Sequence, residues 1–185
     1  METEKLFKIY YNDYPVDILD KNKRLELLPL TKDSMKKYLN DLWEYSNNVS
    51  FYKFLEYEPF ISKEECVHYF NKILDSIKVN NEMLWVIVLK KEEKAIGTIR
   101  LTYWDLYRKN TQVGYGISPH YGRKGYFTEA LSSIINFTFN KLGFYRIESW
   151  TRADNIGSIK GLEKVGFSFE GRLREYLLDH DNFRH

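Results

Sequence analysis

The second half of the chain repeats one arrangement, and this repeat constrains the fold more than any other feature. A helical stretch ends at Leu-Gly-Phe, residues 142–144, and a shorter one ends at Val-Gly-Phe, residues 165–167. Each glycine follows the last apolar position of its helix, as a left-handed terminating residue does. The Phe after each glycine begins a β-rich run, so helices alternate with strands. That alternation predicts an α/β domain.

The first half predicts two helices followed by a meander of strands. Thr31 precedes apolar residues spaced by three and four positions, which predicts a helix over 32–46. Ser62 opens a capping box before a second apolar stripe, which puts Cys66 on the buried side of a helix. A reactive thiol is the alternative interpretation of Cys66. The predicted elements are strands over 25–28, 84–89, 95–103, 111–117, 144–151 and 167–178, helices over 32–46, 62–77, 126–142 and 155–165, and a loop over 47–60.

Charge and cysteine content exclude several classes of protein. The 28 Lys and Arg residues nearly balance the 26 Asp and Glu residues, so the basic excess that nucleic-acid binding needs is missing. A single cysteine leaves no internal disulfide and no Cys-rich metal site. No apolar run approaches the ~20 residues that span a bilayer, and the first residues lack the layout of a signal peptide. We therefore expect a cytoplasmic protein that binds neither metal nor membrane.

The segment over 119–130 joins a predicted strand to the start of a long helix and is the best candidate binding site. Its Gly-Arg-Lys-Gly sequence over 122–125 combines two glycines with two cations. A helix start presents unpaired N–H groups and a partial positive charge, which suits an anion such as pyrophosphate. Gly114 and Gly116 in the preceding strand indicate a bulge or a group that approaches the backbone closely. The alternative is an ordinary strand–helix turn with two solvated cations.

Two segments resemble a known family. Residues 113–131 are similar to the acetyl-CoA loop of the GNAT N-acetyltransferases, and residues 155–167 are similar to their downstream Asn-x-x-Ser segment with its Gly-Phe. Thr-Glu-Ala over 128–130 and Glu-Gly-Arg-Leu-Arg-Glu over 170–175 resemble the subgroup that includes the ribosomal-protein N-terminal acetyltransferases. The resemblance extends from about residue 24 to the end of the sequence.

This resemblance implies a fold and a cosubstrate. The fold is a single GNAT-like domain over 24–185, after an N-terminal arm over 1–23, with a mixed, mostly antiparallel twisted sheet and helices on both faces. The reaction is direct attack of a primary amine on the thioester of acetyl-CoA, without an acyl-enzyme and without a metal. Backbone N–H groups of the loop and of the strand before it then hold the pyrophosphate, the pantetheine and the thioester oxygen. The residues implied in cofactor binding are Tyr115, Ile117, Ser118, Arg123, Lys124, Gly125, Tyr126, Phe127, Thr128, Asn155 and Ser158.

Three positions depart from the family pattern. Gly122 stands where the pattern has Arg or Gln, and Arg123 supplies the displaced cation. Phe127 stands where the pattern has Gly or Ala, so we expect its ring to turn into the core and leave the helix N–H groups open. Leu162 stands where many members have a Tyr. These departures motivate an alternative function, a non-catalytic acyl-CoA-binding or interaction module on the same fold.

The resemblance implies catalytic residues as well. In the ribosomal subgroup a Ser lies three residues after the Asn, which makes Ser158 and Asn155 candidates for protonating the departing thiolate. Both can face the cofactor because they lie one helical turn apart. In the alternative interpretation Asn155 caps its helix and Ser158 only fills the first turn. Glu175 is predicted as the base, with Asp105 and His120 as further candidates.

The acceptor is less defined. The loop over 47–60 and the segment over 103–109 lie where this family builds its acceptor pocket, so Phe54, Trp104 and Asp105 are predicted to bind the acceptor. Acids among aromatic side chains suit a cationic amine. A stacked sugar ring or simple core packing is equally compatible with them.

The sequence ends soon after a hairpin expected near 179–182, where the family has one further strand. An uncovered sheet edge favours association. Either that strand is missing, or a partner subunit or the N-terminal arm covers the gap, and we expect a homodimer.

Overall fold

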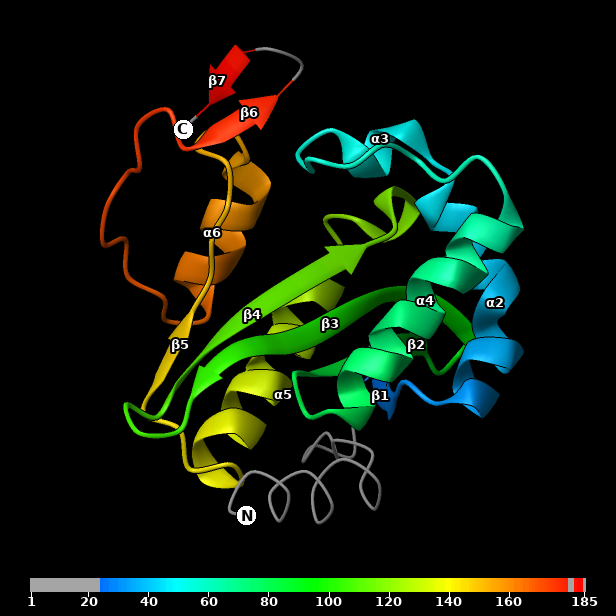
Figure 1. Cartoon of the computed structure of the whole chain (residues 1–185), viewed down its shortest axis with the longest axis horizontal. Helices are drawn as coiled ribbons and strands as arrows, with labels where there is room; N and C mark the ends of the chain where they lie inside the picture. Colours follow the sequence, from blue (N-terminus) through cyan, green and yellow to red (C-terminus); the bar gives the residue numbers. More distant parts are fainter. Residues whose placement is uncertain (1–23, 180–181, 185) are drawn as a thin grey trace.

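Five strands form the central sheet in the computed structural model, which describes residues 24–179 and 182–184. They lie in the order β1–β2–β3–β4–β5; the first four are antiparallel to their neighbours, and β5 runs parallel to β4 (Figure 1). The strands are β1 Leu25–Pro29, β2 Glu82–Leu89, β3 Lys94–Asp105, β4 Asn110–Ile117 and β5 Arg146–Glu148. The mixed sheet confirms the predicted fold class. The arm predicted over 1–23 lies outside the described residues.

Helices cover both faces of this sheet and create two separate cores. The helices are α2 Lys32–Ser46, α4 Lys63–Lys78, α5 Tyr126–Asn140 and α6 Ile156–Lys164. In Figure 1, α2 and α4 lie on one face, and α5 lies on the other. Leu84 and Val86 of β2 belong to the core with α2 and α4, whereas Trp85 and Ile87 belong to the core with α5 and Leu162 of α6. Because its side chains alternate between the two cores, every residue of β2 is buried.

The helix starts follow from local capping. The α2 helix has the predicted bounds because Thr31 Oγ1 accepts a hydrogen bond from the Ser34 N–H at 3.1 Å. Ser62 caps α4 in the same way, through the Glu65 N–H at 3.2 Å. The reciprocal half of that capping box is shifted by one residue, since the Glu65 carboxylate accepts from the Ile61 N–H at 2.9 Å.

The predicted loop over 47–60 contains a short helix, α3 Val49–Tyr52, that explains Gly116 of β4, whereas the Arg100 side chain lies over Gly114. A Cβ at position 116 would lie 2.6 Å from the ring of Phe51, so only glycine fits beneath that ring. The pairing of β3 with β4 runs without interruption past Gly114 and Gly116. Of the two predicted reasons for these glycines, close approach to the backbone is confirmed and a bulge is wrong.

The predicted strands at the end of the sequence are shorter in the structure. The β5 strand has three residues instead of the predicted 144–151, and the prediction of a strand over 167–176 is wrong. That segment contacts β5 through its side chains: Arg146 forms an ion pair and hydrogen bonds with Glu170, while Phe169 stays 78% exposed. Strands need backbone partners, and composition alone supplies none. The expected hairpin is present as a separate pair, β6 Leu177–Asp179 and β7 Asn182–Arg184.

Two further predictions on local structure are confirmed. Gly143 and Gly166 have φ values of 71° and 97°, the left-handed conformation expected after a helix. Cys66 is fully buried in the core, and burial raises the pKa of its thiol. Within the described ranges, no helix is long and apolar enough to cross a bilayer.

Candidate functional site

The connection from β4 to α5 places an open helix start beside two cations. After the short 3-10 helix η1 Pro119–Tyr121, Arg123 and Gly125 adopt positive φ values of 60° and 81°. Gly125 is the N-cap of α5 and provides no side-chain cap. The other α-helices in the described residues all begin with a side-chain cap, so the first N–H groups of α5 alone lack one. These N–H groups, the helix dipole and the exposed Arg123 and Lys124 suit a phosphate group.

Glu129 and Arg24 hold this loop in place through hydrogen bonds. The Glu129 carboxylate accepts hydrogen bonds from the Arg24 N–H at 2.8 Å, the Leu25 N–H at 3.1 Å and Arg24 Nε at 3.0 Å. Arg24 Nη1 donates to the Lys124 carbonyl at 3.0 Å, and the guanidinium lies 4.3 Å from the centre of the Tyr126 ring. Sequence reasoning missed Arg24. Its partners are about a hundred residues away, and no local pattern signals such a contact.

Phe127 packs into the core between α5, α6 and β4. Its ring centre lies 4.3 Å from that of Tyr115, and a Cβ at position 161 would lie 2.2 Å from Phe127 Cε1. Gly161 therefore makes the space that the ring needs. The inward orientation expected for Phe127 is the one in the structure, and it leaves the start of α5 uncovered by this ring.

Beyond residue 112, none of the described strands lies beside β4 on its β5 side. The β4–β5 pairing ends at Gln112 opposite Glu148. The Ser118 N–H donates to the Ile96 carbonyl of β3 at 2.7 Å, so by the alternation of an antiparallel strand the N–H groups of Tyr115 and Ile117 face the open side. Two of the three predicted strand residues thus have N–H groups free to bind a ligand. The third, Ser118, is buried and its N–H is already bonded.

Ser158 faces Tyr115 across this opening. The Tyr115 hydroxyl and Ser158 Oγ share a hydrogen bond, and burial raises the pKa of Tyr115 more than its bonds to Ser158 and Ser149 lower it. Asn155 Oδ1 accepts the Ser158 N–H at 3.1 Å, so Asn155 does cap α6. A hydroxyl pair of this kind can hold or pass on a proton.

The three predicted candidates for the base lie apart from one another. Asp105 accepts hydrogen bonds from the Arg108 N–H and Nη1, both at 2.9 Å, and these bonds lower its pKa. It is the last residue of β3 and pairs with Asn110, the first residue of β4, so it lies at the opposite end of β4 from the loop before α5. His120 is exposed in η1. Glu175 is exposed, with a φ of 52°, next to Tyr176, whose ring stacks on Trp150 at 5.1 Å.

The predicted acceptor residues are likewise divided. Trp104 and Asp105 lie at the β3–β4 turn, whereas Phe54 follows α3, close to the residues after β5. The Arg152 guanidinium lies 6.0 Å from the centre of the Phe54 ring, and Lys53 Nζ lies 5.1 Å from it. The structure does not bring these predicted residues together.

A cluster of aromatic side chains covers the sheet face beneath α4 instead. Successive ring centres lie 4.9 to 6.4 Å apart, and burial raises the pKa of Tyr52 to about 12. This aromatic cluster consists of Tyr45, Phe51, Tyr52, Phe60, Tyr69 and Phe70. These residues come from two predicted helices and the predicted loop between them, and the ring contacts that join them form only in the folded chain.

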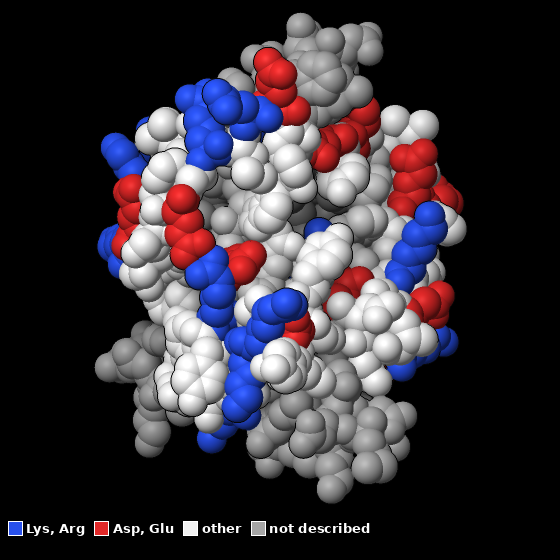
Figure 2. Space-filling view, turned by 60° about the vertical axis from the view of Figure 1, so that its left-hand side comes forward, with Lys and Arg blue, Asp and Glu red and all other residues white. Residues whose placement is uncertain are grey.

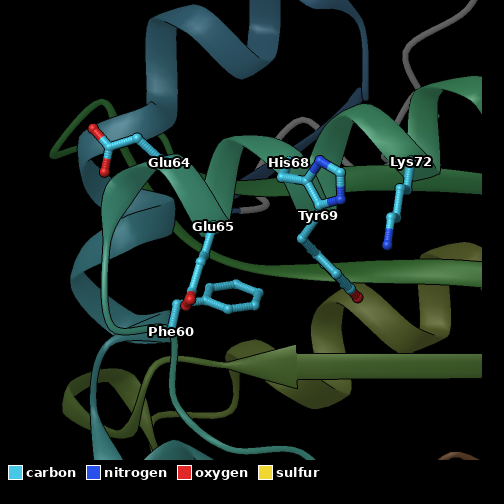
Figure 3. Close-up of a pocket in the computed structure, with 6 residues that line it drawn as sticks. All are labelled: Phe60, Glu64, Glu65, His68, Tyr69 and Lys72. Atoms are coloured by element: carbon cyan, nitrogen blue, oxygen red, sulfur yellow. The ribbon is translucent and has the colours of Figure 1, made fainter.

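A hollow of about 510 Å³ adjoins the cluster. It is lined by Phe60, Glu64, Glu65, His68, Tyr69 and Lys72. Glu65, Tyr69 and Lys72 project from the same side of α4 in Figure 3. Figure 2, which turns the β5 side of the molecule forward, shows a hollow near the centre of that face with a basic side chain in its depth.

Known proteins match this chain over most of its length. The domain family described as Acetyltransferase (GNAT) domain matches residues 24–168. An uncharacterized N-acetyltransferase, p20, from Bacillus licheniformis is 27% identical over 135 residues, which are 73% of this chain and 76% of that protein. Spermidine N(1)-acetyltransferase from Escherichia coli strain K12 is 24% identical over 160 residues, 86% of this chain and 81% of that protein.

Solved structures share the fold. Spermidine N-acetyltransferase from Vibrio cholerae, in complex with CoA and spermine, has a TM-score of 0.72 at 23% identity and covers 88% of this chain and 90% of its own. Ribosomal-protein-S5-alanine acetyltransferase from Vibrio fischeri has a TM-score of 0.68 at 21% identity, covering 89% and 91%. The fold of this chain is therefore that of acetyltransferases.

Proposed function

Because the chain belongs to the GNAT acetyltransferase family, we propose that it moves the acetyl group of acetyl-CoA to a primary amine. The open start of α5 carries this proposal: its uncapped N–H groups, with Arg123 and Lys124, fit a pyrophosphate. The relatives named above act on spermidine and on a ribosomal-protein alanine, both of which present a primary amine. This supports an amine as the acceptor.

The described residues divide the work of the reaction. Acetyl-CoA supplies the acetyl group as an activated thioester. The N–H groups of Tyr115 and Ile117 hold the pantetheine and the thioester oxygen, where donors stabilise the charge that develops. The amine nitrogen forms a bond to the carbonyl carbon as the carbon–sulfur bond breaks. Ser158, hydrogen-bonded to Tyr115, gives a proton to the departing sulfur, and the ammonium loses its proton to a carboxylate such as Glu175 or to water.

Thermal unfolding with and without acetyl-CoA is the first test. At one hundred times Kd a ligand adds about 2.7 kcal/mol, which raises the midpoint by roughly 5–10 °C for a chain of this size. We expect a rise of that order. No rise at millimolar acetyl-CoA would remove the proposal.

Release of free CoA in the presence of amines is the second test. The non-catalytic acyl-CoA-binding module suggested by Leu162 predicts the same thermal shift but no CoA release. In the structure Leu162 is buried and offers no proton donor, so turnover depends on Ser158.

The proposal extends to the cellular location and the oligomeric state of the enzyme. We expect it to act in the cytoplasm, where a lone thiol such as Cys66 stays reduced. We also expect a homodimer, because Phe169, Leu173 and Tyr176 expose apolar surface beside the short β5 edge. Light scattering at micromolar concentration measures the mass directly.

A further inference from the structure

One ion pair lies on the sheet face that carries the aromatic cluster. Arg100 of β3 and Glu82 of β2 form it, with Arg100 Nη1 at 3.7 Å from Glu82 Oε2. The Glu82 side chain is only 10% exposed, whereas the Arg100 side chain is 39% exposed. The pair is therefore buried at its acidic end and open at its basic end.

Both members have hydrogen-bonding capacity left. A separation of 3.7 Å is too long for a hydrogen bond, and Glu82 Oε2 has no hydrogen-bond partner within the described residues. A guanidinium carries five N–H donors, and in the described part of the chain the polar groups placed against that of Arg100 are the Glu82 carboxylate and the Tyr69 hydroxyl. Since the Arg100 side chain is 39% exposed, its remaining donors face solvent and are available to a ligand.

Arg100 also lies next to the opening beside β4. It pairs with Gly114 in the sheet register, and a Cβ at position 114 would lie 3.1 Å from Arg100 Nε. Gly114 directly precedes Tyr115, whose N–H faces the open side of the strand. The guanidinium thus flanks the backbone at which the acetyl group is proposed to sit.

Tyr69 connects the pair to the hollow beneath α4. Its hydroxyl interacts electrostatically with both Arg100 and Glu82, and its ring lines the hollow. Lys72 projects from the same side of α4 and adds a second cation, while the Glu65 carboxylate is bonded to the Ile61 N–H. Glu64 also lines the hollow, but in Figure 3 it projects from another side of α4 than Tyr69 and Lys72, so the two glutamates do not face the cations directly.

Resting on the proposed function, we infer that the acceptor is an amine that also bears a carboxylate, and that Arg100 binds this carboxylate. A guanidinium donates two parallel hydrogen bonds to a carboxylate, which fixes both its position and its orientation. Glu82 is a positioning residue that holds Arg100 from behind. An acceptor with a second ammonium group in the same place would bring a like charge against Arg100 in a site of low dielectric.

Three amines with the same four-carbon chain test this inference: 4-aminobutanoate, 1-aminobutane and 1,4-diaminobutane. Calorimetry on the CoA-saturated protein measures binding without requiring turnover, and CoA release from acetyl-CoA measures kcat and KM. We expect 4-aminobutanoate to bind about tenfold or more tightly than 1-aminobutane, because a charge-assisted pair contributes about 1.5–3 kcal/mol. The diamine should bind most weakly.

Variants of Arg100 test whether this residue produces the preference for 4-aminobutanoate. Arg100→Gln should remove the preference by raising the KM for 4-aminobutanoate to that for 1-aminobutane, and Arg100→Lys should retain part of the preference. Arg108→Gln is the matched control, since it removes an exposed arginine with a carboxylate partner in the β3–β4 turn. Should Arg100→Gln unfold, Arg100→Lys and the three wild-type affinities still decide.

Failure of the inference and failure of the proposed function give different results. Equal affinity for the three amines, a preference for the diamine, binding of none of them, or an unchanged preference in Arg100→Gln would overturn the inference. Acetyl-CoA binding by the wild type, measured by thermal unfolding, would stand in all these cases. Absence of acetyl-CoA binding by the wild type would instead overturn the proposed function.

Discussion

The two sides of the sheet differ in how completely their polar groups are bonded. On the side proposed to bind the cofactor (the cofactor side), Arg24 and Glu129 hold the loop over 118–128, and their charged atoms bond to each other and to the backbone. On the side proposed to bind the acceptor (the acceptor side), Glu82 Oε2 lacks a hydrogen bond within the described residues, and Arg100 lies 3.7 Å from it, too far for one. The network of Arg24 and Glu129 is therefore closed, and the groups left open on this side are the N–H groups at the start of α5.

This difference separates structural from recognition roles. In the closed network the removal of Glu129 takes the acceptor from three donors at once, the N–H groups of Arg24 and Leu25 and Arg24 Nε. An ion pair with unused hydrogen-bonding groups is available to a ligand, and its removal lowers the free energy of unfolding less. We therefore expect mutations on the cofactor side to affect stability and acetyl-CoA binding together, and mutations on the acceptor side to affect specificity.

Glu129→Ala should have the largest effect. It leaves the N–H groups of Arg24 and Leu25 without their acceptor and an arginine without its counterion, so the free energy of unfolding should fall by about 2–3 kcal/mol. The acetyl-CoA-induced rise in midpoint should shrink at the same time. Thermal unfolding with and without acetyl-CoA measures both quantities.

Glu163→Ala is the control for Glu129→Ala, since it removes an exposed carboxylate on α6. Its stability should stay within about 0.5 kcal/mol of the wild type. A Glu129→Ala protein with unchanged stability and an unchanged response to acetyl-CoA would mean that the network does not shape the loop.

Gly161→Ala should have the next largest effect, because a Cβ there would overlap the Phe127 ring. Overpacking of this kind costs about 1–3 kcal/mol. Phe127→Leu should restore part of that loss in the double variant, which a double-mutant cycle measures by chemical denaturation. Gly171→Ala, with open space around it, is the control. Strict additivity of Gly161→Ala and Phe127→Leu would show that the two residues do not share this space.

Ser158→Ala should act on turnover rather than on stability. If Ser158 gives the proton to sulfur, kcat should fall at least tenfold, with the acetyl-CoA shift intact. Asn155→Ala provides the comparison, because the loss of a cap costs about 1 kcal/mol of stability. Equal kcat values for Ser158→Ala and the wild type would shift the proton transfer to Tyr115 or to water.

How far the sequence predicts each side follows the range of its interactions. The bounds of α2 were predicted because Thr31 and Ser34 are three residues apart. The loop before α5 was predicted for the same reason, from its glycines and cations. The contacts of Glu129 with Arg24 and of Arg100 with Glu82 could not be predicted from the sequence, because they join segments that meet only after folding.

The strand predicted over 167–178 does not form over residues 167–176, for a related reason. Its apolar and charged residues alternate as in a strand, but a strand also needs a neighbour with free backbone groups. The short β5 pairs only with β4 in the described residues, and Arg146 binds Glu170 through side chains. Alternation predicts which residues can form a strand, and topology decides whether they do.

The smallest effect is expected at alkaline pH and concerns the contribution of Tyr45, a buried member of the aromatic cluster, to stability. Burial raises the pKa of Tyr45 well above its ordinary value near 10. Below pH 10 the group is neutral in both states and the full stability is present; as pH rises above 10, the unfolded chain ionises Tyr45 while the folded chain resists. Stability should therefore fall by about 1 kcal/mol for this residue between pH 9 and pH 11.

Tyr45→Phe should flatten that fall in denaturant titrations at each pH. Tyr107→Phe, which changes a residue that is 94% exposed, should leave it unchanged. A wild-type curve as steep as that of Tyr45→Phe would mean that the acceptor side admits enough water to solvate the ionised ring, and the aromatic cluster would then be as open as the Arg100 guanidinium beside it.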